Sequence, residues 1–142
     1  MAINRNARHA ALVTMYQLDV VADPDEASLS ASVEEAPGSA ADHRRGLEAG
    51  RAAFAVRDRA DAALGPIAAE WPLHRQPVMD RNILRLAWWE MQEAGTPPAL
   101  AINEAVDLAK EYGTDRSSAF VNGVLGAFLR GVREAVPAPA EA

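Results

Sequence analysis

The side chains that most often catalyse reactions are scattered along this sequence. Its three histidines stand at positions 9, 43 and 74, in separate segments, and none has the spacing of a zinc-protease motif. Glycine-rich phosphate loops and the Gly-x-Ser-x-Gly motif are absent, and there is no cysteine to form disulfides or thiolate metal sites. Ser117 and Ser118 are better explained as a helix cap than as nucleophiles. We therefore expect no catalytic residue, no cofactor and no metal, and hence no enzyme.

The first residues of the chain suit a different chemistry, the binding of phosphate and bases. Arg5 and Arg8 are three positions apart, so they share one face at the start of a helix. A helix N-terminus also presents free N–H groups and partial positive charge. Tyr16, two turns beyond Arg8, can stack on an unpaired base. The pattern fits RNA contact, but exposed arginines that solvate the helix and a tyrosine packed against a neighbour are the alternatives.

The distribution of charge leaves room for a small RNA site. The net charge of −6 disfavours broad coating of nucleic acid. However, seven acidic residues and no Lys or Arg lie between positions 19 and 42, whereas the first 18 residues contain no acid. The apolar stretches are too short to span a membrane, and the N-terminus lacks the apolar core of a secretory signal. These features indicate a cytoplasmic protein without a membrane segment.

Apolar residues recur at helical spacing throughout, and no segment alternates as strands do. We therefore expect an all-α fold, a single compact bundle of about six or seven helices. Long helices are predicted near residues 6–21, 42–64, 78–93, 99–112 and 118–132. The acidic segment 22–41, which contains two prolines, is predicted to be a loop with at most one helical turn. One domain is expected over residues 1–136, followed by a disordered tail at 137–142.

Several segments are more specific than helical periodicity requires. They read R-N-A-R-H-A-A-L at 5–12, D-R-N-I-L-R-L-A-W-W-E-M at 80–91, A-I-N-E-A-V-D-L-A-K at 101–110 and F-V-N-G-V-L at 120–125. In order and spacing, these segments resemble four helices of the NusB family. The similarity covers nearly the whole chain apart from residues 22–41 and the tail.

The resemblance implies an all-helical fold of two packed subdomains and a role in transcription antitermination. Members of this family bind boxA-type RNA together with the ribosomal protein NusE. They act in an antitermination complex with RNA polymerase and support rRNA transcription. Asn6 stands where the family often has another arginine, so RNA binding by this chain is expected to be weaker or more dependent on the partner.

The resemblance also assigns expected roles to individual residues. The RNA-binding candidates are Arg5, Arg8, Tyr16 and Phe120. The candidates for partner binding are Asp80, Arg81 and Arg85, which we expect on the exposed side of their helix, where their charge can complement NusE. Asn122, a polar residue in an apolar helix, is predicted to be buried and hydrogen-bonded to Asn103 or Glu104.

Two other functions remain open from the sequence. The thin arginine cluster and negative net charge fit a helical module that binds protein and has weak or lost RNA affinity. The same fold also occurs as the N-terminal domain of an rRNA methyltransferase, so an accessory role to such an enzyme is the other alternative. Because family members differ in self-association, a homodimer is also possible.

Overall fold

Helices account for almost all regular structure in the computed structural model, which describes residues 3–69, 71–131 and 136–138. No strand occurs in these residues, so the prediction of an all-α fold is confirmed. In chain order the elements are α1 (Arg5–Val20), α2 (Glu26–Glu34), α3 (Ala40–Ala55), α4 (Arg57–Leu64), a 3-10 turn η1 (Leu73–Arg75), α5 (Val78–Gln92), α6 (Pro98–Tyr112) and α7 (Ser117–Arg130).

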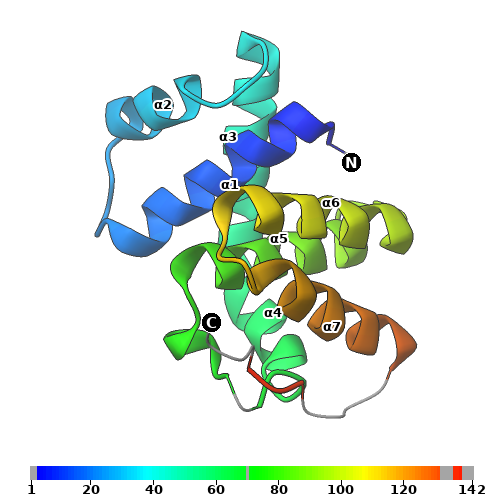
Figure 1. The fold of residues 1–142 in the computed structure, drawn as a ribbon. Coiled ribbons are helices and arrows are strands. Elements are labelled where there is room, and N and C mark those ends of the chain that lie inside the picture. The colour runs from blue at the N-terminus through cyan, green and yellow to red at the C-terminus, as the bar shows by residue number, and fades with distance from the viewer. Residues whose placement is uncertain (1–2, 70, 132–135, 139–142) are drawn as a thin grey trace.

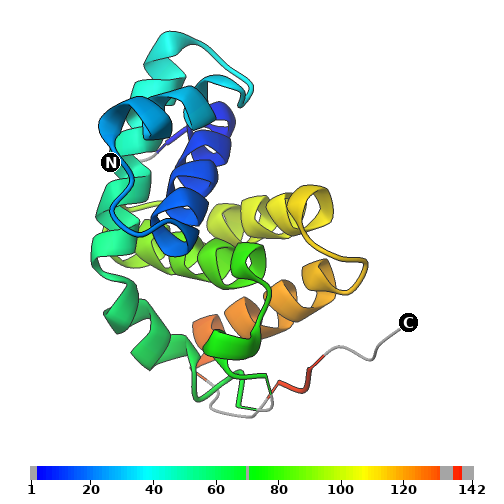
Figure 2. The ribbon, with the colours of Figure 1, turned by 90° about the vertical axis from the view of Figure 1, so that its left-hand side faces the viewer.

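The helices form two groups that pack on each other. In Figures 1 and 2, α1, α2 and α3 make up the upper part of the molecule, and α5, α6 and α7 lie below them. Helix α1 packs along α3 and also contacts α2 and α5. Side-chain hydrogen bonds, such as that from Arg8 to Glu104, join α1 to α6. Helix α5 contacts every other helix except α2 closely. The two groups correspond to the two packed subdomains that the resemblance implied.

Small residues allow α1 and α3 to approach closely. Gly46 and Gly50 lie one turn apart on the face of α3 that meets α1. A Cβ at Gly46 would lie 2.6 Å from the carbonyl oxygen of Ala7, and a Cβ at Gly50 would lie 2.7 Å from the Cβ of Thr14. Real Cβ atoms do not come this close, so the crossing depends on glycine at both positions.

Side-chain caps fix where the first three helices begin. Asn4 accepts a hydrogen bond from the backbone N–H of Ala7 at 2.8 Å, which caps α1. Ser39 and Asp42 form a reciprocal capping box at the start of α3. The side-chain amide of Asn4 also donates to Asp42 at 2.8 Å, so the first turns of α1 and α3 are joined.

Two predictions about this part of the chain were wrong. The acidic segment 22–41 contains helix α2, because Asp25 caps it and Leu29 and Val33, four positions apart, are buried against α1 and α3. The single helix predicted for 42–64 is two helices separated at Val56. Arg57 stabilises this break, since its Nη1 donates to the carbonyl oxygen of Phe54 at 2.9 Å.

Helix α5 occupies the centre of the lower group, and nine of its residues are buried. Helix α7 buries Val121, Val124 and Leu125 against it and its neighbours. Beyond α7, Val136 donates its N–H to the carbonyl oxygen of Ile67. Residues 139–142 of the predicted tail lie outside the described residues, so that prediction stays untested. Within the described ranges, no helix is long and apolar enough to cross a membrane.

Candidate nucleic-acid interface

Arg8 is buried, although the sequence predicted an RNA-binding side chain on the surface. Only 3% of its side chain is exposed. Its Nε and Nη2 donate to the two carboxylate oxygens of Glu90 at 2.8 and 2.6 Å, and its Nη1 donates to Glu104 at 3.0 Å. Nη2 also donates to the carbonyl oxygen of Ile3 at 3.1 Å. The guanidinium therefore ties the start of α1 to α5 and α6.

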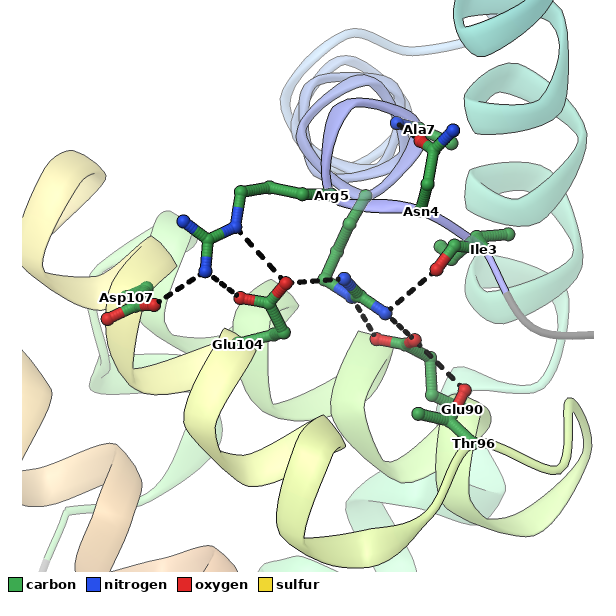
Figure 3. A network of polar contacts seen from close by, with 9 residues as sticks. Ile3, Asn4, Arg5, Ala7, Glu90, Thr96, Glu104 and Asp107 are labelled. Carbon is green, nitrogen blue, oxygen red and sulfur yellow. Dashed lines mark hydrogen bonds and ion pairs between the residues drawn. The ribbon is translucent and has the colours of Figure 1, made fainter.

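Arg5 lies one turn earlier and is exposed, with 64% of its side chain open to solvent. Its Nε and Nη2 donate to Glu104 at 3.2 and 2.7 Å, and Nη2 also donates to Asp107 at 3.1 Å (Figure 3). Among the described residues, Nη1 makes no hydrogen bond. The carboxylate of Glu104 thus binds both Arg5 and Arg8, and it holds the guanidinium of Arg5 with one edge facing outward.

An aromatic pair lies next to this ion-pair cluster. The Nδ1 of His9 is 3.1 Å from the hydroxyl of Tyr112, and the two rings meet edge to face with centroids 5.6 Å apart. Burial raises the pKa of Tyr112, and the carboxylate of Glu111 adds to the effect. A cavity of about 50 Å³ lies between α1 and α6 and is lined by Arg5, Arg8, His9, Glu104, Asp107, Leu108 and Glu111. No group of acidic and histidine side chains among the described residues is arranged to hold a metal ion.

The two aromatic candidates differ in how accessible they are. Tyr16 is half-buried on α1, so part of its side chain reaches solvent. Phe120, at the start of α7, is only 3% exposed and packs edge to face against Trp71 with ring centroids 4.6 Å apart. Its ring is covered in this structure, so Phe120 contributes to packing under the surface rather than to the surface itself.

The expectation that Asp80, Arg81 and Arg85 lie on an exposed helix face was wrong. Asp80 is fully buried, Arg85 is buried, and 18% of the Arg81 side chain is exposed. The prediction assumed that α5 buries only one face, but α5 is central and is covered on nearly all sides.

These three side chains hold helices together. Arg81 donates to both carboxylate oxygens of Asp19 at 2.7 and 2.9 Å, and Arg85 joins Asp19 to Asp61. Burial alone would raise the pKa of Asp19, but hydrogen bonds from Arg81 and Asn82 hold it below its usual value. The network connects the end of α1 to α4 and α5.

Asp80 has a different environment, because its described side-chain partner is a hydroxyl rather than a cation. Burial raises the pKa of Asp80, and the hydrogen bond from Ser117 offsets part of this rise. The Oγ of Ser117 lies 2.9 and 2.8 Å from the two carboxylate oxygens. This contact joins the first turn of α5 to the first turn of α7.

The predicted polar lock around Asn122 was also wrong in its main member. Asn122 and Asn103 are exposed, while Glu104 is buried and pairs with Arg5 and Arg8. Glu90 and Asp107 complete the ion-pair cluster and were not predicted from the sequence. Glu90 directly follows two tryptophans in a helix with a buried apolar face. A carboxylate at such a position needs a cation to pair with when it is buried, and this was the signal that could have identified it.

Comparison with known proteins identifies the family. Residues 5–130 match the NusB family model. This range includes Arg5, Arg8 and all four of the specific segments named above. The chain belongs to the NusB family. One relative is the transcription antitermination protein NusB of Anaeromyxobacter dehalogenans, which is 39% identical over 129 residues that cover 89% of each chain.

Solved NusB structures have the same fold. The chain superposes on NusB of T. maritima with a TM-score of 0.74 and 28% identity, covering 94% of this chain and 95% of that one. A second NusB-fold chain, from a structure of the antitermination factors NusB and NusE in complex with dsRNA, gives a TM-score of 0.74 at 24% identity. That match covers 89% of this chain and 96% of the other, and it shows the fold alone.

Proposed function

We propose that this NusB-family protein is a transcription antitermination factor that binds boxA-type RNA together with NusE. It acts in the cytoplasm as part of an antitermination complex with RNA polymerase and supports rRNA transcription. Its family membership and the names of its relatives support this role. The proposed partner and ligand class are those of the NusB-fold chain that was solved with NusE and dsRNA.

The observation that supports RNA binding is the exposure of the Arg5 guanidinium, which Glu104 holds in a fixed orientation. Its guanidinium is exposed at the first turn of α1, next to the capped helix N-terminus. Glu104 fixes its orientation, so little side-chain entropy remains to be lost when its outward edge meets a phosphate. Binding needs no chemical step, because affinity comes from phosphate contact, base stacking and burial against the partner protein.

The other three RNA-binding candidates have different roles in this proposal. Arg8 is a positioning residue, since it shares Glu104 with Arg5 and holds the backbone at Ile3. Tyr16 offers its exposed part for stacking on a base. Phe120 packs beneath the surface.

The three partner-binding candidates differ in how much of each side chain is exposed. Arg81 is the most exposed of the three, and we propose that the exposed part of its side chain contacts NusE. Asp80 and Arg85 are buried and set the position of α5 beneath Arg81.

A direct test measures the binding of a fluorescent boxA-type RNA and a scrambled RNA of equal length. Each is titrated with the protein alone and with NusE, at low and at high salt. The proposal predicts that boxA-type RNA binds more tightly than the scrambled RNA, that NusE increases the affinity, and that salt lowers it. If NusE binds but neither RNA does, the chain is a protein-binding helical module instead.

A further inference from the structure

Two carboxylates hold Arg5, and they differ in burial. Glu104 has 10% of its side chain exposed and is shared with Arg8, so it is a fixed part of the helix interface. Asp107, one turn further along α6, is 49% exposed. Among the described contacts, Asp107 pairs only with the Nη2 of Arg5, at 3.1 Å (Figure 3).

The orientation of Arg5 does not require Asp107. Glu104 already accepts hydrogen bonds from Nε and Nη2, the paired geometry that fixes a planar guanidinium. Asp107 adds a second acceptor to Nη2 from the solvent side. It therefore occupies a donor that an approaching phosphate oxygen would otherwise use.

The local charge also opposes an anion. The cluster contains the cations Arg5 and Arg8 and the carboxylates of Glu90, Glu104 and Asp107. Arg8 and Glu90 neutralise each other in the interior, and Arg5 then faces two carboxylates. The surface at Arg5 is therefore net negative until a carboxylate is neutralised or moves away.

We propose that Asp107 is an intramolecular competitor of RNA: it occupies Arg5 in the free protein and is displaced from Nη2 when a phosphate binds. This inference rests on the proposed function, since it concerns the same Arg5 contact. Glu104 keeps the guanidinium in place during the exchange, because it is anchored by Arg8. The competition limits the affinity for any single phosphate, so stable binding depends on additional contacts from the RNA or the partner.

The test compares Asp107→Asn with Asp58→Asn, which removes the same charge from an exposed position on α4. Both variants are titrated with fluorescent boxA-type single-stranded RNA at low salt, after thermal unfolding confirms that they fold. Asp107→Asn should tighten binding by about two- to five-fold, the effect of an exposed charge pair near a phosphate, whereas Asp58→Asn should change it less. Unchanged or weaker binding by Asp107→Asn would overturn the inference.

Arg5→Gln separates this inference from the proposed function. In the Arg5→Gln background, Asp107→Asn should give a smaller gain than in the wild-type background, because the competed donor is gone. If Arg5→Gln weakens RNA binding but the gain from Asp107→Asn is the same in both backgrounds, only the competitor role is wrong. If neither the wild-type protein nor Asp107→Asn binds RNA, the proposed function and the inference both fail.

Discussion

Arg5 and Arg8 have the same side chain, are three positions apart and share the carboxylate of Glu104, yet they have different roles. Arg8 points into the seam between α1, α5 and α6, where Glu90 satisfies two of its donors. Arg5 reaches over the surface of α6. Loss of one member of a buried ion pair strongly destabilises the folded protein, whereas an exposed pair contributes little to its stability.

We therefore expect Arg8→Met and Arg5→Met to differ in stability. Arg8→Met leaves Glu90, which is 1% exposed, without its cation and should lower the free energy of unfolding by about 3–5 kcal/mol. Arg5→Met should cost about 1 kcal/mol or less. Urea unfolding of the two variants measures the difference. Equal midpoints would show that Arg8 is not the structural anchor that its contacts indicate.

The crossing of α1 and α3 depends on close backbone approach at Gly46. Gly46→Ala places a methyl group against the backbone of Ala7 and should destabilise the protein by about 1–3 kcal/mol. Gly126→Ala on α7 is the matched control. Among the described residues, its new Cβ would meet only the flexible end of Arg130, so the gain in helix propensity should stabilise the protein by about 0.5–1 kcal/mol.

Thermal or urea unfolding of both glycine variants gives the comparison. A Gly46→Ala variant as stable as the wild type would mean that α1 and α3 can separate without cost, which would contradict the packing of the upper group of helices.

The link between the first turns of α1 and α3 should make stability depend on pH. Hydrogen bonds from the Asn4 side chain and the Ser39 backbone lower the pKa of Asp42 from 3.8 to about 2. A lowered pKa means that the carboxylate stabilises the folded state above the unfolded pKa, and that this contribution is lost as pH falls through about 2. Asp42→Asn should therefore be less stable than the wild type at neutral pH, with a difference that shrinks in acid.

Urea unfolding of wild type and Asp42→Asn across this pH range measures the difference directly. A difference that does not change between neutral pH and the pKa of about 2 would show that the ionised carboxylate does not provide the stabilisation.

For the whole molecule, the sequence was sufficient for the fold class and for most helices, because apolar spacing reports which face of a helix is buried. The sequence was not sufficient where a helix is buried on several sides, because its apolar spacing then no longer distinguishes a buried face from an exposed one. Helix α5 is central, so Asp80 and Arg85 are buried, although the apolar spacing predicts that they face solvent. Helix α2 was missed because its acidic residues and flanking prolines hid two buried apolar positions.

The ion-pair cluster was beyond the reach of sequence for a similar reason. Arg5 and Arg8 could be placed on one helix, but Glu90 and Glu104 come from elements that are brought to α1 only by the tertiary fold. Long-range partners of this kind decide which of two neighbouring arginines is buried. The sequence therefore predicted that Arg5 and Arg8 lie together at the start of one helix, but not which of them is buried.

RNA binding by this protein is proposed to depend on contact between an RNA phosphate and Arg5 at the start of α1. The most direct test is the salt dependence of boxA-type RNA binding for wild type, Arg5→Gln and the control Arg130→Gln, which removes an exposed arginine at the end of α7. Loss of one phosphate contact should weaken binding by Arg5→Gln and reduce the slope of log K against log salt by about 0.7, while Arg130→Gln should match the wild type. Wild-type affinity and slope in Arg5→Gln would contradict the claim.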